Sequence, residues 1–361
     1  MKEERRTTLP GAPTIEVRGG LQAALTAESL AAIPIRHLEN WLGARRWFGA
    51  KGRKIASALF RFVAPFPLSV GAGAMSVLEV SFEGSCELAW YQLPLIVLPT
   101  RIGDSSVSPR VLAHVVSSGE CGIVMDATED ARFRGGVGEL LGNGSVLDAT
   151  DGSWVFEPVG SSARVVPATS RLGQTEQSNT SIVYGESEIL KLFRKLEVGE
   201  HPDVEIARFL TTRTTFRNTP ELLGSIRLES AVGASVSGML ARYATRATDA
   251  WAHALFRARE YLTAEDDSPA NPFAGEAREL GRVTRQLHEA LSSAADDPAF
   301  APVRVGDAHI AAWADAARGA TEQGFDLLAR RVDTLDAPMR APAQALLRRR
   351  GAASAHVDAL A

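Results

Sequence analysis

The residues best suited to chemistry lie in one short stretch near the middle of the chain. Lys191 occupies an apolar run, Glu188 to Phe193, whose pattern predicts a β-strand. Burying an unpaired ammonium is costly, so Lys191 requires an anionic partner, either a ligand or a carboxylate. Glu205 follows fourteen residues later, in a segment from Asp203 to Leu210 that is predicted to be helical. A lysine and a glutamate placed in this way could bind and orient a phosphate group.

A strand lysine paired with a glutamate on the next helix is the arrangement that protein kinases use to hold the phosphates of ATP. The turn before it, Gln174 to Thr180, is polar, and its backbone N–H groups and hydroxyls are suited to phosphate although it lacks a glycine-rich pattern. A pair of solvated surface residues would show the same spacing. The spacing alone therefore leaves both interpretations open.

Two motifs in the chain resemble those of bacterial maltokinases. The first resembles their nucleotide-binding lobe and consists of the segments Glu176–Ser181, Leu190–Arg194 and Pro202–Glu205. The second, Arg46-Trp47-Phe48-Gly49-Ala50-Lys51-Gly52-Arg53, is similar to the signature of their N-terminal cap domain. The similarity runs from about Leu38 to the end of the chain and is weak from Gly135 to Gly152.

This resemblance implies an α+β protein with a bilobal, eukaryotic-kinase-like fold, an extra N-terminal cap subdomain and an incomplete C-lobe. The expected divisions are a flexible lead (1–19), the cap (20–105), a β-rich intermediate region and N-lobe that carries the lysine (106–244), and a partial helical C-lobe (245–361).

The resemblance also implies an activity and a site. The family transfers the γ-phosphate of ATP to the anomeric hydroxyl of maltose, with Mg²⁺, and maltose 1-phosphate then serves α-glucan (glycogen) synthesis; trehalose synthase is a possible partner. Lys191 would bind phosphate and Glu205 would orient it. The strand from Ser237 to Tyr243 would form the adenine-side hinge. The phosphate loop would consist of Ser178, Asn179, Thr180 and Ser181.

The catalytic motifs of that family are missing from these 361 residues. Phosphoryl transfer needs a catalytic-loop aspartate and a second aspartate for Mg²⁺, which the family supplies as His-Gly-Asp and Asp-Phe-Glu segments. Neither occurs, so we predict no catalytic residue and no metal ligand. Two short segments superficially resemble the catalytic loop, but Asp307 is predicted to be the N-cap of a long helix, and Asp203 lies between the lysine strand and the glutamate helix. Both are interpreted as structural.

Three interpretations remain. The chain is a maltokinase-family protein without its catalytic C-terminal half, or a non-catalytic homologue that binds nucleotide or a partner such as trehalose synthase, or an interaction protein that keeps the cap and has lost nucleotide binding. We favour the first, because Lys191, Glu205 and the Ser-Asn-Thr-Ser turn are all present.

The elements that must position these residues change character along the chain. Strand-like runs dominate the first part, at Ala58–Val63, Met75–Phe82, Leu88–Gln92, Gly122–Met125 and Ser153–Glu157. We expect a short helix at Val111–Ser117 and a loop from Gly135 to Gly152. After Pro220 the pattern predicts helices at Ala250–Leu262, Glu276–Leu291, Ala308–Leu335 and Ala341–Leu360. A β-rich part followed by a helical part suits an α+β protein with two lobes.

Composition excludes several classes of protein. Hydrophobic residues make up 45% of the chain and charged residues 23%, which is ordinary for a globular protein. The net charge of -4 argues against a nucleic-acid-binding surface. The two cysteines, Cys86 and Cys121, match no metal spacing. No apolar run approaches the roughly 20 residues of a membrane span, and no signal peptide is recognisable, so we expect a cytoplasmic protein.

Overall fold

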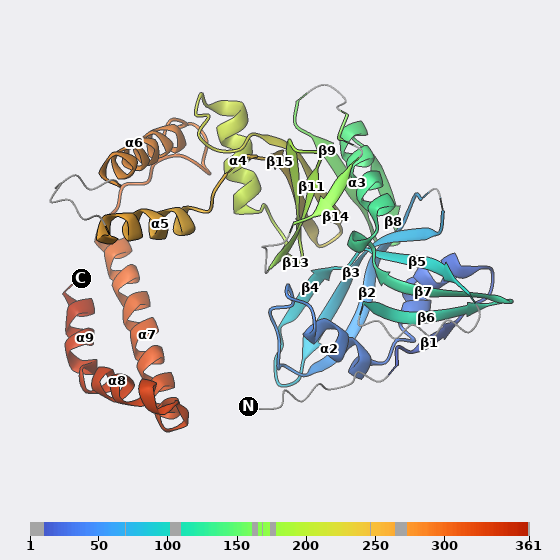
Figure 1. Cartoon of the computed structure of the whole chain (residues 1–361), viewed down its shortest axis with the longest axis horizontal. Helices are drawn as coiled ribbons and strands as arrows, with labels where there is room; N and C mark the ends of the chain where they lie inside the picture. The colour runs from blue at the N-terminus through green and yellow to red at the C-terminus, as the bar shows by residue number, and fades with distance from the viewer. Residues whose placement is uncertain are drawn as a thin grey trace. The chain divides into compact units, whose positions relative to one another are not determined.

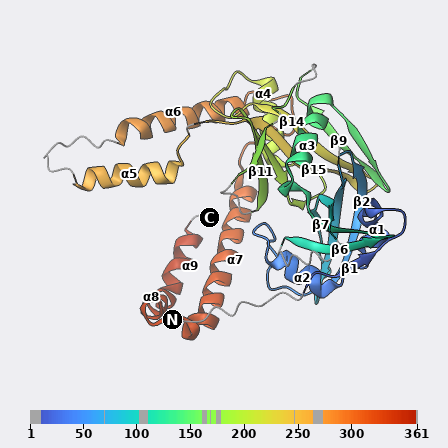
Figure 2. The same cartoon turned by 45° about the vertical axis from the view of Figure 1, so that its right-hand side comes forward.

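The computed structural model describes residues 11–68, 70–101, 110–160, 165–167, 169–173, 178–245, 247–263 and 273–359. The chain divides into two compact units, residues 1–291 and residues 292–361. Unit 1 contains two β-sheets and the helices around them, and unit 2 is helical (Figures 1 and 2). The mixed α+β class expected from the sequence is confirmed.

The first sheet of unit 1 has the strand order β1-β6-β7-β5-β3-β4-β13, with β2 paired to β3. Only β1 and β6 are paired in parallel, and the other neighbours are antiparallel. Helices α1 (Ala27–Leu30) and α2 (Ile35–Gly43) and a 3-10 helix at Leu21–Leu25 precede β2 in the chain. The strands are β1 (Thr14–Glu16), β2 (Ile55–Phe66), β3 (Ala72–Phe82), β4 (Leu88–Gln92), β5 (Leu95–Thr100), β6 (Val111–Ser117), β7 (Glu120–Asp126) and β13 (Lys195–Leu196).

The segment Val111–Ser117 is strand β6, and the predicted short helix is wrong there. Its valines are β-branched and favour the strand. The strand pairs with β7 on one side and β1 on the other, which buries most of its side chains. The first sheet therefore continues past residue 105, where we expected the cap to end.

The second sheet is antiparallel throughout and has the order β10-β11-β12-β15-β14-β9-β8. Helix α3 (Ala131–Asn143) packs on its β9 side and α4 (Pro202–Arg213) near β14. The strands are β8 (Val146–Ala149), β9 (Gly152–Pro158), β10 (Ser170–Leu172), β11 (Asn179–Tyr184), β12 (Glu188–Phe193), β14 (Leu222–Ser230) and β15 (Gly233–Arg242).

Most of the segment from Gly135 to Gly152, predicted as loop, forms the end of α3 and strand β8. Glycines are used here for close packing: a Cβ on Gly136 would lie 2.8 Å from Phe66 Cε1, and one on Gly138 would lie 3.2 Å from Tyr184 Cε1. The helix ends at Gly144, whose left-handed backbone (φ 67°) suits glycine.

One hydrophobic core joins the two sheets. Side chains of β2 and β3, such as Phe66 and Val77, share this cluster with Trp154 of β9 and Leu190 of β12. The indole Nε1 of Trp154 also donates a hydrogen bond of 2.9 Å to the backbone carbonyl of Phe62. The first sheet packs directly against the second, as predicted for the cap and the β-rich lobe. The cap residues do not form this sheet alone, however, because β1, β6, β7 and β13 lie outside the predicted cap and belong to the same sheet.

The second part of the chain is helical, as predicted, but the single helix expected at Ala341–Leu360 is divided at Arg349 into two helices. Unit 1 contains α5 (Ala250–Thr263) and α6 (Ala274–Leu291), and unit 2 contains α7 (Asp307–Arg331), α8 (Ala337–Arg348) and α9 (Arg350–Asp358). The N-cap of α7 is Gly306 rather than Asp307, which is the first helical residue and complements the helix dipole. None of the helices among the described residues is long and apolar enough to cross a membrane.

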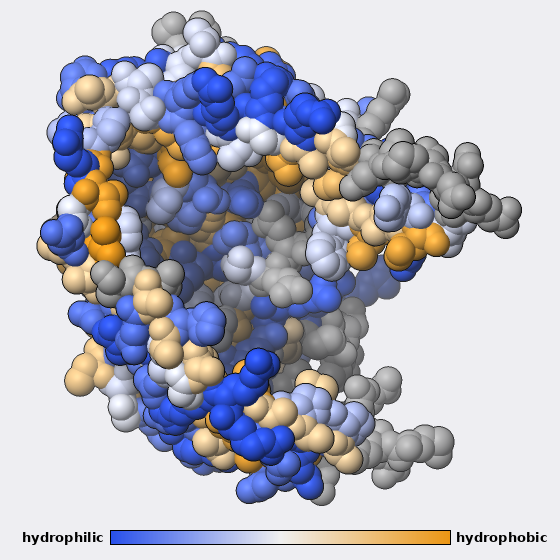
Figure 3. Space-filling model, turned by 90° about the vertical axis from the view of Figure 1, so that its left-hand side faces the viewer, coloured by the Kyte–Doolittle hydropathy of each residue, from blue (hydrophilic) through white to orange (hydrophobic). Residues whose placement is uncertain are grey.

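Several large apolar side chains of these helices are exposed. Figure 3 shows hydrophobic side chains between hydrophilic ones on the face that it presents. The exposed apolar residues of α5 and α6 include Trp251, Phe256, Leu262 and Leu280, and those of unit 2 include Trp313 and Met339.

Candidate functional site

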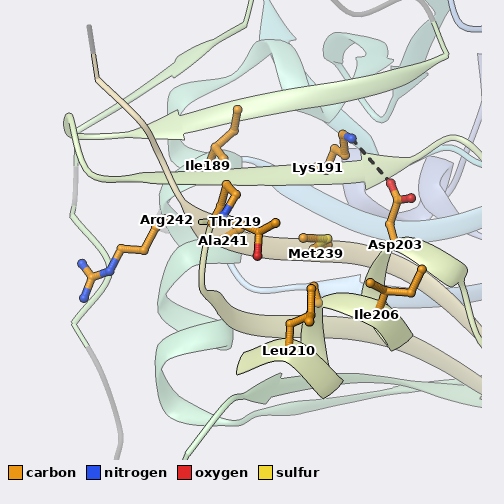
Figure 4. A pocket seen from close by; sticks show the side chains of 11 residues that line it. Ile189, Lys191, Asp203, Ile206, Leu210, Thr219, Met239, Ala241 and Arg242 are labelled. Atoms are coloured by element: carbon orange, nitrogen blue, oxygen red, sulfur yellow. Dashed lines mark ion pairs between the residues drawn. The ribbon is translucent and has the colours of Figure 1, made fainter. Parts of the chain in front are cut away.

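A pocket of about 460 Å³ lies between the second sheet and α4. Ile189 and Lys191 of β12 and Met239 and Ala241 of β15 line it from the sheet, and α4 closes it from the other side (Figure 4). The remaining lining residues are Asp203, Ile206, Ala207 and Leu210 of α4, with Thr219, Pro220 and Arg242. The alternation of side chains along β12 and β15 places these residues on the face opposite the shared core.

Lys191 and Asp203 form an ion pair at this pocket, with 3.6 Å between Nζ and Oδ2. Their side chains are 36% and 52% exposed. The prediction that Lys191 lies on a central strand and pairs with a carboxylate of the next helix is confirmed. The partner is Asp203, however, and the expected pairing with Glu205 is wrong.

The start of α4 explains why Asp203 is the partner. His201 is the N-cap and Pro202 the first residue of the helix. Helical side chains tilt toward the N-terminus, so an acidic residue at the beginning of the first turn reaches toward the strand before it. The carboxylate also lies at the positive end of the helix dipole. The sequence analysis interpreted Asp203 as structural. Its position in the first turn of the predicted helix, two residues before Glu205, is the sequence feature that could have indicated it as a partner of Lys191.

The predicted phosphate loop is only partly a loop. Ser178 directly precedes β11, whereas Asn179, Thr180 and Ser181 belong to the strand, and residues 174–177 lie outside the described part of the chain. The hydroxyl of Thr180 accepts a hydrogen bond from Arg194 Nε at 2.8 Å. Ser181 is buried and lies directly opposite Lys191 in the β11–β12 register. Any contact of these residues with phosphate stays a prediction.

The predicted hinge strand corresponds to the end of β15. Met239 and Ala241 line the pocket, and the backbone N–H of Tyr243 donates to the carbonyl of Ser187 at 2.8 Å. The end of β15 is thus tied to the turn that leads into β12.

Burial raises the pKa of Tyr184 on β11, the strand on the other side of β12 from β15; its hydroxyl donates a hydrogen bond of 2.7 Å to the Arg134 carbonyl.

Arg194 connects the two sheets directly behind the lysine strand. It is the single residue between β12, in the second sheet, and β13, in the first. Its guanidinium is 2.8 Å from Asp126 Oδ2, and the two side chains are 2% and 9% exposed. It also donates to Thr128 Oγ1 and lies 4.8 Å from the ring centroid of Trp47, in the predicted cap motif. Sequence reasoning assigned no role to Arg194, because nothing local marks a charged residue as buried.

The described residues do not form a site for Mg²⁺. No group of three or more histidine, cysteine, aspartate or glutamate side chains that could hold a metal ion occurs among them. The carboxylate at the pocket, Asp203, already faces an ammonium group.

Residues 41–130 match the family model of the maltokinase N-terminal cap domain. This segment of the chain is therefore similar to the maltokinase N-terminal cap domain. The matched region begins in the last turn of α2, contains strands β2 to β7 of the first sheet, and ends just before α3.

A solved structure of a glucosamine kinase is similar in fold to this chain. The structure in complex with glucosamine, ADP and inorganic phosphate is 18% identical, with a TM-score of 0.50, and the match covers 93% of this chain and 65% of that one. Crystal forms A and B of the glucosamine kinase give TM-scores of 0.49 and 0.48 at the same identity. The chain therefore has a kinase-like fold and spans about 65% of the length of the first of these kinases.

Proposed function

We propose that the pocket beside Lys191 binds an ATP-type nucleotide. The observation that carries this proposal is a lysine ammonium at one end of a pocket lined mainly by apolar side chains. A nucleotide has the same two parts, an anionic phosphate chain and a flat base. Lys191 would contact phosphate, and Ile189, Met239 and Ala241 would contact the base.

The ion pair at the pocket is suited to ligand binding rather than to holding the fold together. Because both side chains are partly exposed, the Lys191–Asp203 pair contributes only about 0–1 kcal/mol to stability. A phosphate group carries more negative charge than one carboxylate and can attract the same ammonium. The pocket volume of about 460 Å³ lies within the usual range of small-molecule sites.

For the reaction, we propose ATP-dependent phosphorylation of a sugar, with maltose as the acceptor. The cap domain supports maltose, and the kinase-like fold, seen in a relative solved with a sugar, ADP and phosphate, supports a sugar kinase. Lys191 would neutralise charge on the phosphates and hold them in place, which is most of what catalysis of phosphoryl transfer requires. Trehalose synthase as a partner and a cytoplasmic location stay predictions.

We further propose that these 361 residues bind nucleotide without transferring phosphate. No His-Gly-Asp or Asp-Phe-Glu segment occurs in them, and the described carboxylates do not form a metal site. The His-Gly-Asp aspartate, which would accept the proton of the sugar hydroxyl, is therefore missing from these 361 residues. A non-catalytic homologue would also bind nucleotide without transferring phosphate.

A fluorescent ADP analogue titrated into purified chain tests the binding site. Lys191→Ala should weaken binding by about tenfold or more, because it removes a charge-assisted contact worth about 1.5–3 kcal/mol. Lys195→Ala is the matched control, since Lys195 lies four residues further on, outside the pocket, and pairs with Glu197. Equal affinity of the wild type and Lys191→Ala, or no binding at all, would overturn the proposal and favour an interaction protein.

Incubation with ATP, Mg²⁺ and maltose tests the second part. We expect no maltose 1-phosphate above the level seen with Lys191→Ala. Turnover that Lys191→Ala abolishes would contradict the proposed lack of transfer while supporting the nucleotide site.

A further inference from the structure

His201 connects the lysine strand to the helix that carries its partner. As N-cap of α4, it has an extended backbone (φ −91°, ψ 126°), and its ring Nδ1 accepts a hydrogen bond of 3.2 Å from the backbone N–H of Asp203. The ring stacks on Phe193 of β12, with 3.8 Å between the centroids and 6° between the planes. The imidazole is thus held between β12 and the first turn of α4.

The choice of histidine at this position is unusual. Serine, threonine, aspartate and asparagine are the preferred N-caps, and none of them changes its charge near neutral pH by accepting a proton on the capping atom. The amide that His201 caps belongs to Asp203, whose carboxylate pairs with Lys191. Phe193, which orients the ring, lies two residues after Lys191 on the same strand.

We propose that His201 is a positioning residue that makes the Lys191–Asp203 geometry, and with it nucleotide affinity, dependent on pH. The affinity part rests on the proposed nucleotide site. The structural part, in which the protonation of His201 controls the start of α4, does not depend on any ligand.

Protonation of the ring acts on this site in two ways. Because Nδ1 is an acceptor, the neutral ring carries its proton on Nε2. Protonation turns Nδ1 into a donor that faces the Asp203 N–H, so the cap is lost. It also places a positive charge at the positive end of the helix dipole, which is unfavourable. The Asp203 carboxylate, two residues away, can then turn toward the imidazolium and away from Lys191.

The other charged groups around His201 are already engaged or lie on the same first turn. Glu200, in the preceding segment, is 3.9 Å from Arg227 of β14. On the strands, Lys191 of β12 pairs with Asp203, and Lys195 of β13 pairs with Glu197. From α4, Asp203 and Glu205 contribute the acidic charges of the first turn. Within the described residues His201 itself forms no ion pair, so its charge state is free to act on Asp203.

The test compares wild type, His201→Asn and His201→Ala. Asparagine accepts the same amide hydrogen bond and does not titrate, whereas alanine offers no acceptor. His288→Asn, at an exposed position of α6, is the control for a histidine unrelated to the site. The fluorescent ADP analogue is titrated at pH values from 5.5 to 8, and its own ionisation affects all variants equally.

We expect wild type to lose about three- to tenfold more affinity than His201→Asn between pH 8 and pH 5.5, as the loss of one N-cap would produce. His201→Ala should bind weakly at both pH values, His201→Asn should rescue that loss, and His288→Asn should follow wild type. Parallel pH profiles for wild type and His201→Asn would overturn the inference.

A measurement without nucleotide separates this inference from the proposed function. The NMR amide resonance of Asp203 should shift with pH together with the His201 ring protons in wild type, and should lose that step in His201→Asn. An Asp203 amide that does not follow the ring would overturn the coupling. If Lys191→Ala binds nucleotide like wild type while the amide does follow the ring, the nucleotide site is wrong and the His201 coupling stands.

Discussion

Replacing Asp126 by asparagine should destabilise unit 1 by about 3–5 kcal/mol, because it leaves the Arg194 guanidinium buried without its counter-ion. The loss should be this large because the pair is out of water: the two side chains are 2% and 9% exposed. At a separation of 2.8 Å and an effective dielectric constant of about 20, the attraction amounts to about 6 kcal/mol before desolvation is subtracted.

Arg194 forms an ion pair with the carboxylate of Asp126. Its other contacts are neutral: Nε donates to Thr180 Oγ1, one terminal nitrogen donates to the Gln92 carbonyl, and the other donates to Thr128 Oγ1. Thr128 also donates to Asp126 through both its N–H and its hydroxyl. Asparagine at position 126 would keep the shape of the side chain and lose its charge.

Urea unfolding gives the free energy of unfolding for wild type, Asp126→Asn, Arg194→Met and the double variant Asp126→Asn/Arg194→Met. The double variant should be less destabilised than the sum of the two single changes, since neither member of the pair is then left charged and buried without the other. Glu87→Gln is the matched control, because Glu87 and Arg53 are also 2.8 Å apart but are both exposed. Its urea midpoint should equal that of wild type within error.

A loss below about 1 kcal/mol for Asp126→Asn would refute this reasoning, since that is the range of a solvated surface pair. So would a double variant whose destabilisation equals the sum of the two single changes, because the two charges would then not interact.

Three further predictions concern the packing of unit 1. Trp154→Phe should cost about 1–3 kcal/mol in urea unfolding, because the buried carbonyl of Phe62 loses its donor. Gly152→Ala should cost about 1–3 kcal/mol in the same assay, since the new Cβ would lie 2.2 Å from the Glu229 carbonyl oxygen; an unchanged midpoint would contradict this close approach. Burial lowers the pKa of His37 in the folded chain. As the pH falls, His37 is therefore protonated in the unfolded chain before it is protonated in the folded chain. The free energy of unfolding should thus decrease as the pH falls below about 6.5. A His37→Gln variant should lack this part of the pH dependence in urea midpoints measured between pH 5 and pH 8.

The lysine strand and its partner helix could be predicted because their signals are local. A lysine among apolar residues indicates a strand whose lysine needs an anionic partner, and Pro202 is typical of the first residue of a helix. The choice between Asp203 and Glu205 could not be made in this way. Both lie on the first turn of α4, and the direction in which that helix meets β12 decides which one reaches Lys191.

The elements that were wrongly predicted depend on contacts between distant parts of the chain. The glycines of α3 resemble a loop in the sequence and are tolerated in a helix because it lies against Phe66 and Tyr184. Val111–Ser117 becomes a strand through its pairing with β1 and β7. Arg194 gave no local signal, because its counter-ion Asp126 is 68 residues away in the sequence.

Photolabelling with 8-azido-ATP, which carries its reactive group on the base, tests whether the pocket beside Lys191 binds the nucleotide. Peptide mapping by mass spectrometry locates the modified residues in wild type and in Lys191→Ala. We expect labels within β12 or β15, at residues such as Ile189 or Met239 that line the pocket, and strongly reduced labelling in Lys191→Ala. Labels confined to the first sheet or to unit 2, or labelling that Lys191→Ala leaves unchanged, would contradict it.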